Sequence, residues 1–434
     1  MLSAAQITSG IGTAVGLSLS SLVVAQLSGS VTISGLAGTA GVLGAALLAL
    51  PTARTSGRGG RRAGLALAYG CALLGCVIVV AAITVRSWPL LLAGLVLFGS
   101  ASAGSLASRY SATDLSPPGH SARHLSWVVW ATTIGSVAGP NLVEPAEHLG
   151  RALGLAPDTG PFALSMVTFA IALAVIAVGL RPDPLLVARS VATPAPAAPA
   201  QTTPVQAAPA QDATAQSAPA SAVPPAPATA SASASTSTDK HEGTLRTAWH
   251  ALRRTRAASQ ALIAIAVSHT AMVSIMSMTP VHLDHGGATY SVIGIVISLH
   301  IAGMYILSPV VGWLADRIGR VPVLVLGMGL LLAAAVLAGG AGTEDVPRVT
   351  AGLALLGAGW SCGLIAGSAM LSEAVRLEHR PAVQGLSDLL MNVCGAMGAV
   401  IAGVVVGTLS YGLLCTVVAV MVTITGGWLA LRRV

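Results

Sequence analysis

Charged residues are scarce in this sequence. Asp, Glu, Lys and Arg make up 9% of its 434 residues, whereas roughly a quarter of an average soluble domain is charged. Aromatic residues are also few, at 3%, while hydrophobic residues account for 54%. A soluble enzyme is excluded by this balance, because a soluble fold needs a far larger polar surface. The composition is that of a membrane protein.

Cysteine and lysine are rare too, and several motifs are missing. The cysteines lie inside apolar runs without the spacing of a disulfide framework or a zinc ribbon, so we expect reduced thiols that pack between helices; they are Cys71, Cys76, Cys362, Cys394 and Cys415. The one lysine, Lys240, follows no glycine-rich loop, so a Walker A sequence for ATP is absent. With no H-E-x-x-H or G-x-S-x-G motif either, we expect no enzymatic activity and no cofactor.

Long apolar runs are what the sequence has instead. Windows of about 19 residues mark twelve segments, each close to the roughly 20 residues that cross a bilayer. Six of them lie near residues 7–28, 32–51, 64–85, 89–110, 125–143 and 161–180, and six near 258–281, 289–312, 321–340, 349–371, 383–408 and 410–430. We therefore predict an all-α membrane protein with twelve transmembrane helices in two six-helix bundles, residues 1–182 and 246–434.

Residues 183–245 separate the predicted bundles and have a different composition. Between residues 190 and 238 the chain is almost wholly Ala, Pro, Ser, Thr, Val and Gln, and Asp212 is its only charge. Such a stretch buries too little apolar surface to offset the entropy of ordering. We predict a disordered linker.

Basic residues are distributed unevenly over the predicted loops. All 22 Lys and Arg residues except Arg86, Arg151 and Arg348 fall on one side of the membrane in this topology. The positive-inside rule then predicts that both termini and the linker are cytoplasmic, in a multi-pass protein of the bacterial inner membrane. The net charge of +7 reflects this orientation, so the lipid bilayer and not a nucleic acid is the expected partner.

The loop after the eighth segment contains glycines, an aspartate and arginines at fixed spacing. Glycines allow a tight turn between close helices, and an aspartate beside arginines can join helix ends by charge-assisted bonds. The pattern resembles the cytoplasmic signature of the major facilitator superfamily, and we predict a conformational latch made by Gly312, Asp316, Arg317, Gly319 and Arg320. The equivalent loop of the first half, residues 52–62, keeps basic residues but has no aspartate.

The seventh and eighth segments contain soft ligand atoms at helical spacing. Met272 and Met276 share one helix face, and His300 and Met304 share another. At about 1.5 Å of rise per residue, Met272 and His300 lie nearly level on antiparallel helices, so the two faces can oppose each other. Thioether and imidazole groups suit Cu(I) and are poor ligands for Mg²⁺ or Ca²⁺. The alternative is ordinary packing, because methionine commonly fills helix cores.

These pairs, together with other stretches in both halves, resemble the CcoA-like branch of the superfamily, whose members import copper. The other stretches are residues 109–114, 139–141, 359–360 and 384–388. The resemblance implies a secondary transporter that imports copper, with Met272, Met276, His300 and Met304 as ligands for Cu(I). A periplasmic or cytoplasmic copper chaperone is the implied protein partner of a monomeric carrier.

A proton-coupled carrier of a small organic solute is the alternative function. Relatives in the same branch are linked to riboflavin, and Gly135 to Pro140 resembles an element shared by antiporters of the superfamily. That element can equally be a small-residue packing face. In this case copper is not the cargo, and the Met and His pairs are packing residues.

Further residues are candidates for metal capture and for coupling. Met278, His282 and His285 lie at the outer mouth of the seventh segment and can capture copper ions. His269, Glu373 and Asp388 are candidate coupling residues. For the two carboxylates, structural ion pairs with the nearby Arg376 and Arg380 are the alternative, and His269 can equally be bonded to a neighbouring helix.

Overall fold

The computed structural model describes residues 1–30, 33, 36–192, 246, 248, 249, 252 and 255–432, and all of the regular structure in this part is α-helical. In the first half the helices are α1 (Leu2–Ser28), α3 (Leu36–Thr84), α4 (Trp88–Phe98), α5 (Ser100–Ser111), α6 (Ser121–Asn141), α7 (Val143–Ala152), α8 (Gly160–Gly179) and α9 (Pro184–Ala192). In the second they are α11 (Arg256–His285), α12 (Tyr290–Tyr305), α13 (Ser308–Ile318), α14 (Arg320–Gly339), α15 (Val346–Ala374), α16 (Arg380–Thr408) and α17 (Tyr411–Leu431).

The helices supply the twelve crossings that the apolar runs predict. Ten stretches of the described chain are long and apolar enough to span a bilayer. One of them, α3, has 49 residues and turns back at Gly60, so it supplies two crossings. Helix α6, with 21 residues, corresponds to the fifth predicted segment. Two crossings are each built from two helices, α4 with α5 and α12 with α13.

The first-half loop predicted at residues 52–62 is wrong as a loop. Helix α3 continues through it and departs from helical geometry at Gly60, where φ is 84° and ψ is 173°. A glycine there has no Cβ to oppose the positive φ, so the reversal needs a single residue. The beginning of the predicted linker is also different, because residues 184–192 form α9. Asp183 stabilises the start of this helix by accepting from the backbone N–H of Leu185 and Leu186. The rest of the predicted linker lies outside the described residues.

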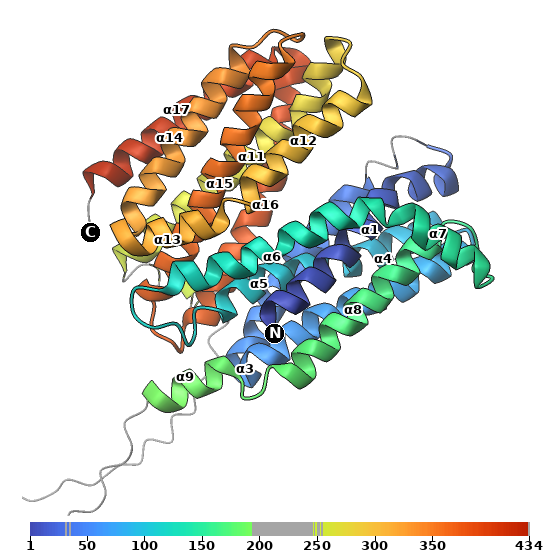
Figure 1. The fold of residues 1–434 in the computed structure, drawn as a ribbon, viewed down its shortest axis with the longest axis horizontal. Coiled ribbons are helices and arrows are strands. Elements are labelled where there is room, and N and C mark those ends of the chain that lie inside the picture. The colour runs from blue at the N-terminus through green and yellow to red at the C-terminus, as the bar shows by residue number, and fades with distance from the viewer. Residues whose placement is uncertain are drawn as a thin grey trace, which may run out of the picture.

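Figure 1 shows α1 to α8 gathered on one side of the molecule and α11 to α17 on the other, with α13 lying against α6. Within the first group, small residues let helices approach closely. A Cβ on Gly135 would lie 2.6 Å from the carbonyl carbon of Gly10, and one on Gly139 would lie 2.3 Å from Cβ of Ala14. The Gly135 to Pro140 element therefore packs α6 on α1, which is the alternative to its antiporter interpretation.

Candidate functional site

The two halves are joined by polar contacts at one end of the molecule. We call it the Arg61 end; the opposite end, where α3 connects to α4, is the Arg86 end. In the described chain, the side chains that hydrogen-bond across the halves gather at the Arg61 end: Arg61 with Gln384, Arg109 with Asp388, Tyr110 with Ser387, and Asp316 with the backbone of Ala122 and Arg123. This end is closed.

The predicted latch residues lie at the contact between α13 and α6. Asp316 accepts from the backbone N–H of Ala122 at 3.2 Å and of Arg123 at 2.9 Å, at the start of α6. A carboxylate is favoured there, because the first N–H groups of a helix are unpaired and carry partial positive charge. Gly312 permits the approach, since a Cβ on it would lie 2.4 Å from Oγ of Ser126.

Gly319, Arg320 and Arg317 complete this region within the second half. Gly319 has φ 98° and forms the turn into α14. Arg320 donates twice to Glu373, at 2.7 and 3.2 Å, and also pairs with Asp316 at 2.7 Å. Arg317 lies over the ring of Trp313, 5.1 Å from its centroid. Arg320 therefore ties the carboxylate that contacts α6 to the end of α15.

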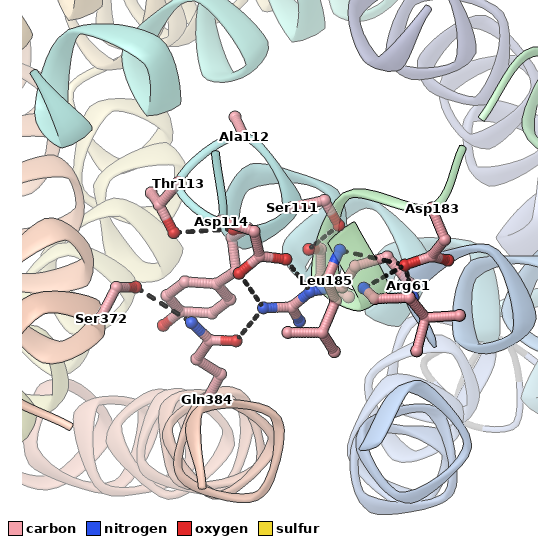
Figure 2. A network of polar contacts seen from close by, with 12 residues as sticks. Arg61, Ser111, Ala112, Thr113, Asp114, Asp183, Leu185, Ser372 and Gln384 are labelled. Atoms are coloured by element: carbon pink, nitrogen blue, oxygen red, sulfur yellow. Dashed lines mark hydrogen bonds and ion pairs between the residues drawn. The ribbon is translucent and has the colours of Figure 1, made fainter. Parts of the chain in front are cut away.

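A second network surrounds Arg61, at the turn of α3 (Figure 2). Its guanidinium donates to both carboxylate oxygens of Asp114, at 2.6 and 3.0 Å, and to Gln384 of α16 at 2.7 Å. Gln384 in turn donates to Ser372. The backbone N–H groups of Arg61 and Arg62 donate to the carboxylate of Asp183. A buried arginine thus joins the two halves while its charge is balanced within the first half.

Arg109 and Asp388 form a buried ion pair between α5 and α16. Nη2 of Arg109 lies 2.7 Å from Oδ1 of Asp388, and the side chains are 2% and 5% exposed. Tyr110 accepts from the same guanidinium and donates to Ser387. Charges inside a membrane protein are costly and generally mark a functional site. The pair joins a buried charged side chain of the first half to one of the second.

A small cavity lies next to Arg109. It has a volume of about 50 Å³ and polar or aromatic groups from five helices line it, including Gln6, Ser105, Arg109, Tyr305 and Trp360. The ring of Trp360 meets that of Tyr305 edge to face, and its indole N–H donates to Nδ1 of His269 at 3.0 Å. The cavity therefore has a cationic side, an amide side and an aromatic side.

The predicted copper ligands are not arranged as two opposing faces. Helix α15 packs against both α11 and α12. As a result, α12 has few contacts with α11. His300 is completely buried and its Nδ1 lies 2.8 Å from the carbonyl oxygen of Leu353 on α15. The expectation that the α11 and α12 faces oppose each other is therefore wrong. Spacing places residues on a helix face, but it does not say which helix that face meets.

The other predicted ligands are buried to different degrees. Met272 and Met304 are buried and Met276 is half-buried, all within or against one large hydrophobic core. Among the described residues no group of three or more His, Cys, Asp or Glu side chains is arranged to hold a metal. That criterion leaves out thioethers, so the four-residue copper site stays a prediction.

The residues predicted at the outer mouth also have packing contacts. Met278 is half-buried and its methyl group lies near Gly403. His282 stacks on Tyr411 with ring centroids 4.2 Å apart, and His285 is exposed. A capture role for the three residues stays a prediction.

The two candidate coupling carboxylates, Glu373 and Asp388, do not pair with Arg376, one of the nearby arginines considered for them. Glu373 pairs with Arg320 and Asp388 pairs with Arg109, whereas Arg376 pairs with Glu378. The sequence-based interpretation also missed Arg61 and Gln6. Their signals were weak: one arginine in a basic stretch, and one amide near the start of an apolar run.

The all-helical fold, with apolar helices of membrane-spanning length in two groups, defines the class of protein as a membrane transporter. The sequence profile described as Major Facilitator Superfamily matches residues 2–287 and 261–434. The chain belongs to this superfamily, and transport by a multi-pass integral membrane protein is its function.

Relatives in sequence agree with the family assignment, and a solved structure shares the fold. The chain is 32% identical over 411 residues to the "Uncharacterized MFS-type transporter YddS" of Bacillus subtilis (strain 168), covering 94% of this chain and 84% of the relative. It is 28% identical to the riboflavin transporter RfnT of Brucella anthropi, over 29% of this chain and 31% of the relative. A bacterial homologue of the iron transporter ferroportin has a TM-score of 0.68 at 14% identity, covering 100% of this chain and 98% of that one.

Proposed function

We propose that this chain is a secondary transporter of the bacterial inner membrane that carries a small organic solute and couples its movement to protons. The buried Arg109–Asp388 pair carries the proposal. Its members belong to different halves, so a rocking movement that opens the Arg61 end has to break their contact. A charged pair at this position links the ionisation of a carboxyl group to the conformation of the carrier.

Charge balance explains how a proton would act. Asp388 faces the guanidinium of Arg109, and Arg61 is the next cation that acts on it. The charge of Arg61 is balanced by Asp114, which leaves Arg109 as the main partner. Protonation of Asp388 removes the charge that holds Arg109, and the charge-assisted bond between the halves weakens. A proton therefore favours opening of the Arg61 end.

The basic residues orient this cycle. In the topology predicted from the sequence, nearly all Lys and Arg residues share a side of the membrane with Arg61, so we assign the Arg61 end to the cytoplasm. The closed Arg61 end then corresponds to a carrier that is accessible from outside. Proton entry from outside would drive the change to the inward-accessible state, which suits import.

A distance measurement between the halves tests the coupling without knowledge of the solute. Spin labels replace the exposed Arg86 and Glu344 at the Arg86 end, in a chain whose native cysteines are changed to alanine. We expect acidification to shorten the distance between the labels. Asp388→Asn should give the short distance at every pH, because the neutral amide mimics the protonated acid.

The matched control is Glu378→Gln, which removes an exposed carboxyl group at the Arg61 end. It should leave the pH response unchanged. A distance that does not change with pH in the wild type, or a wild-type response in Asp388→Asn, would refute proton coupling through Asp388.

Copper import is a second candidate, and one observation favours it. His300 is fully buried and its Nε2 has no hydrogen-bond partner among the described residues, while Met304 lies one turn further along. An unprotonated imidazole nitrogen beside a thioether suits Cu(I). Uptake of radioactive copper by cells that express the wild type, His300→Ala or Met272→Ala at equal membrane levels tests this candidate. Copper uptake by the wild type that is lost in both variants supports this candidate. Wild-type uptake equal to that of cells without the protein rejects it.

A further inference from the structure

Two side chains that line the small cavity have buried polar atoms with no partner among the described residues, donors on one side chain and an acceptor on the other. Nη2 of Arg109 donates to Asp388 and Tyr110, but Nε and Nη1 have no partner among the described residues. Gln6 donates through its amide nitrogen to Ser105 and Thr132, and its Oε1 has no partner there. Buried donors and acceptors are nearly always satisfied in folded proteins. A ligand that accepts from Arg109 and donates to Gln6 would satisfy both.

The local charge selects the kind of acceptor. Arg109 is 2% exposed, and its one positive charge is already shared with Asp388. A single added negative charge is balanced when Asp388 takes up one proton, whereas a dianion would leave an uncompensated charge in a buried site. A monoanionic carboxylate therefore fits this site better than a phosphate.

The volumes of two cavities indicate where the parts of such a ligand would lie. The cavity beside Arg109, at about 50 Å³, accepts a head group only. A second cavity of about 390 Å³ lies further along α1 and α5, two of the helices that line the first cavity, and it also meets α16; Thr13, Ser102 and Asn392 are part of its lining. Their spacing from Gln6, Arg109 and Asp388 is seven, seven and four residues, which keeps each pair on one helix face.

The larger cavity can hold the body of the solute. Hydroxyl groups of Thr13, Ser20 and Ser102 lie there beside the apolar side chains of Leu17 and Phe98. Mixed walls of this kind are typical of sites for small organic molecules.

Building on the proposed transport function, we propose that the solute is a hydroxycarboxylic acid. Its carboxylate accepts from Arg109, its hydroxyl group donates to Oε1 of Gln6, and its body lies in the larger cavity. One proton on Asp388 accompanies each carboxylate, so that the occupied site carries no added charge.

Binding to the purified full chain in nanodiscs tests this assignment independently of transport. Saturation-transfer NMR detects weak ligands, and the probes are lactate, propionate and lactamide. Propionate lacks the hydroxyl group, and lactamide lacks the charge. We expect lactate to bind about tenfold more tightly than lactamide, with propionate between them, in line with the strength of hydrogen bonds to charged groups. Equal binding of lactate and lactamide, or no saturable binding of either acid, would overturn the proposal.

Three variants locate the site. Gln6→Met should reduce lactate binding to the level of propionate and leave propionate unchanged. Arg109→Gln combined with Asp388→Asn should abolish binding of both acids, and the double change avoids an unpaired buried charge. Arg86→Gln at the opposite end should change neither. Wild-type binding in the double variant would remove Arg109 from the site. A pH-dependent distance between the halves of the wild-type protein, lost in Asp388→Asn, would then leave the proposed function standing.

Discussion

Two junctions close the Arg61 end, α13 against α6 and α3 against α16, and they occupy equivalent places in the two halves. Gly60 and Gly319 form their turns with nearly the same backbone, at φ 84° and ψ 173° and at φ 98° and ψ 163°. Each is followed by an arginine that pairs with an acid of its own half, Arg61 with Asp114 and Arg320 with Glu373. Arg61 and Asp114 are 53 residues apart in the sequence, and Arg320 and Glu373 are also 53 residues apart.

The junctions differ at the position three residues before the turn. The second half has Asp316 there, which accepts from the N–H groups of Ala122 and Arg123. The first half has Gly57, and a Cβ added to it would lie 3.8 Å from Cβ of Pro381, near the start of α16. Proline has no N–H group. The missing aspartate is thus matched by a missing donor at the position equivalent to Ala122.

The difference shows that one closed geometry is reached by two kinds of contact. At α13 and α6 a carboxylate binds a helix N-terminus. At α3 and α16 the side chain of Arg61 crosses to Gln384, and small residues pack so tightly that a Cβ on Gly385 would lie 2.2 Å from Cβ of Ala53. The two junctions can therefore be weakened separately.

The largest effect is expected from Arg61→Ala. The change leaves Asp114 buried without its cation, and breaking a buried pair from one side costs about 3–5 kcal/mol. The thermal unfolding midpoint of the purified protein should fall strongly. Arg58→Ala, at an exposed arginine of the same turn, should have little effect.

The double variant Arg61→Met with Asp114→Leu separates the effect of an unpaired buried charge from the effect of lost packing. It should recover most of the stability, because no unpaired charge remains. If Arg61→Ala is as stable as Arg58→Ala, the network in Figure 2 does not stabilise this junction.

A smaller effect is expected from Gly385→Ala. The added methyl group would meet Ala53, and overpacking of this kind costs about 1–3 kcal/mol. Ala53→Gly in the same chain should restore the spacing and the unfolding midpoint. The same logic applies across the other junction to Gly312→Ala. Failure of Ala53→Gly to rescue would mean that the close contact is not what limits substitution at Gly385.

The crossings were predictable from sequence, but the contacts between them were not. Bilayer thickness sets the length of each apolar run, so α8 and α14 were predicted to within a residue or two. The loop predicted at residues 52–62 was wrong because a single glycine suffices to reverse α3. Helix spacing placed His300 and Met304 on one face, yet only the packing of α15 between α11 and α12 decides what that face meets.

The candidate site illustrates the same limit. Glu373 and Asp388 were visible as charged residues near helix ends, and their positions in the sequence pointed to Arg376 and Arg380 as alternative partners. Their actual partners, Arg320 and Arg109, come from helices far apart from them in the chain. The pairing of buried charges depends on tertiary packing, which residue spacing along one helix does not report.

Asp316→Ala should act on conformation more than on stability. Loss of a carboxylate at a helix N-terminus costs about 1 kcal/mol, which is roughly a fivefold change in the balance between closed and open forms. The spin labels at positions 86 and 344 should report a larger share of short distances. Asp345→Ala is the control, since Asp345 accepts from the N–H of Arg348 within one half. It should reduce stability without changing the distance, and an equal shift in both variants would contradict the role of Asp316.

The smallest effect is expected when the first junction is made to resemble the second. Gly57→Asp alone should not favour the closed form, because Pro381 offers no N–H group to the new carboxylate. Gly57→Asp with Pro381→Ala supplies both the acceptor and the donor, and should favour the closed Arg61 end by up to about 1 kcal/mol. The label distances of the two variants and of Pro381→Ala test this. If Gly57→Asp by itself lengthens the distance as much as the double change does, the carboxylate acts through general attraction to nearby arginines, and the absence of the N–H donor in the first half does not explain the asymmetry.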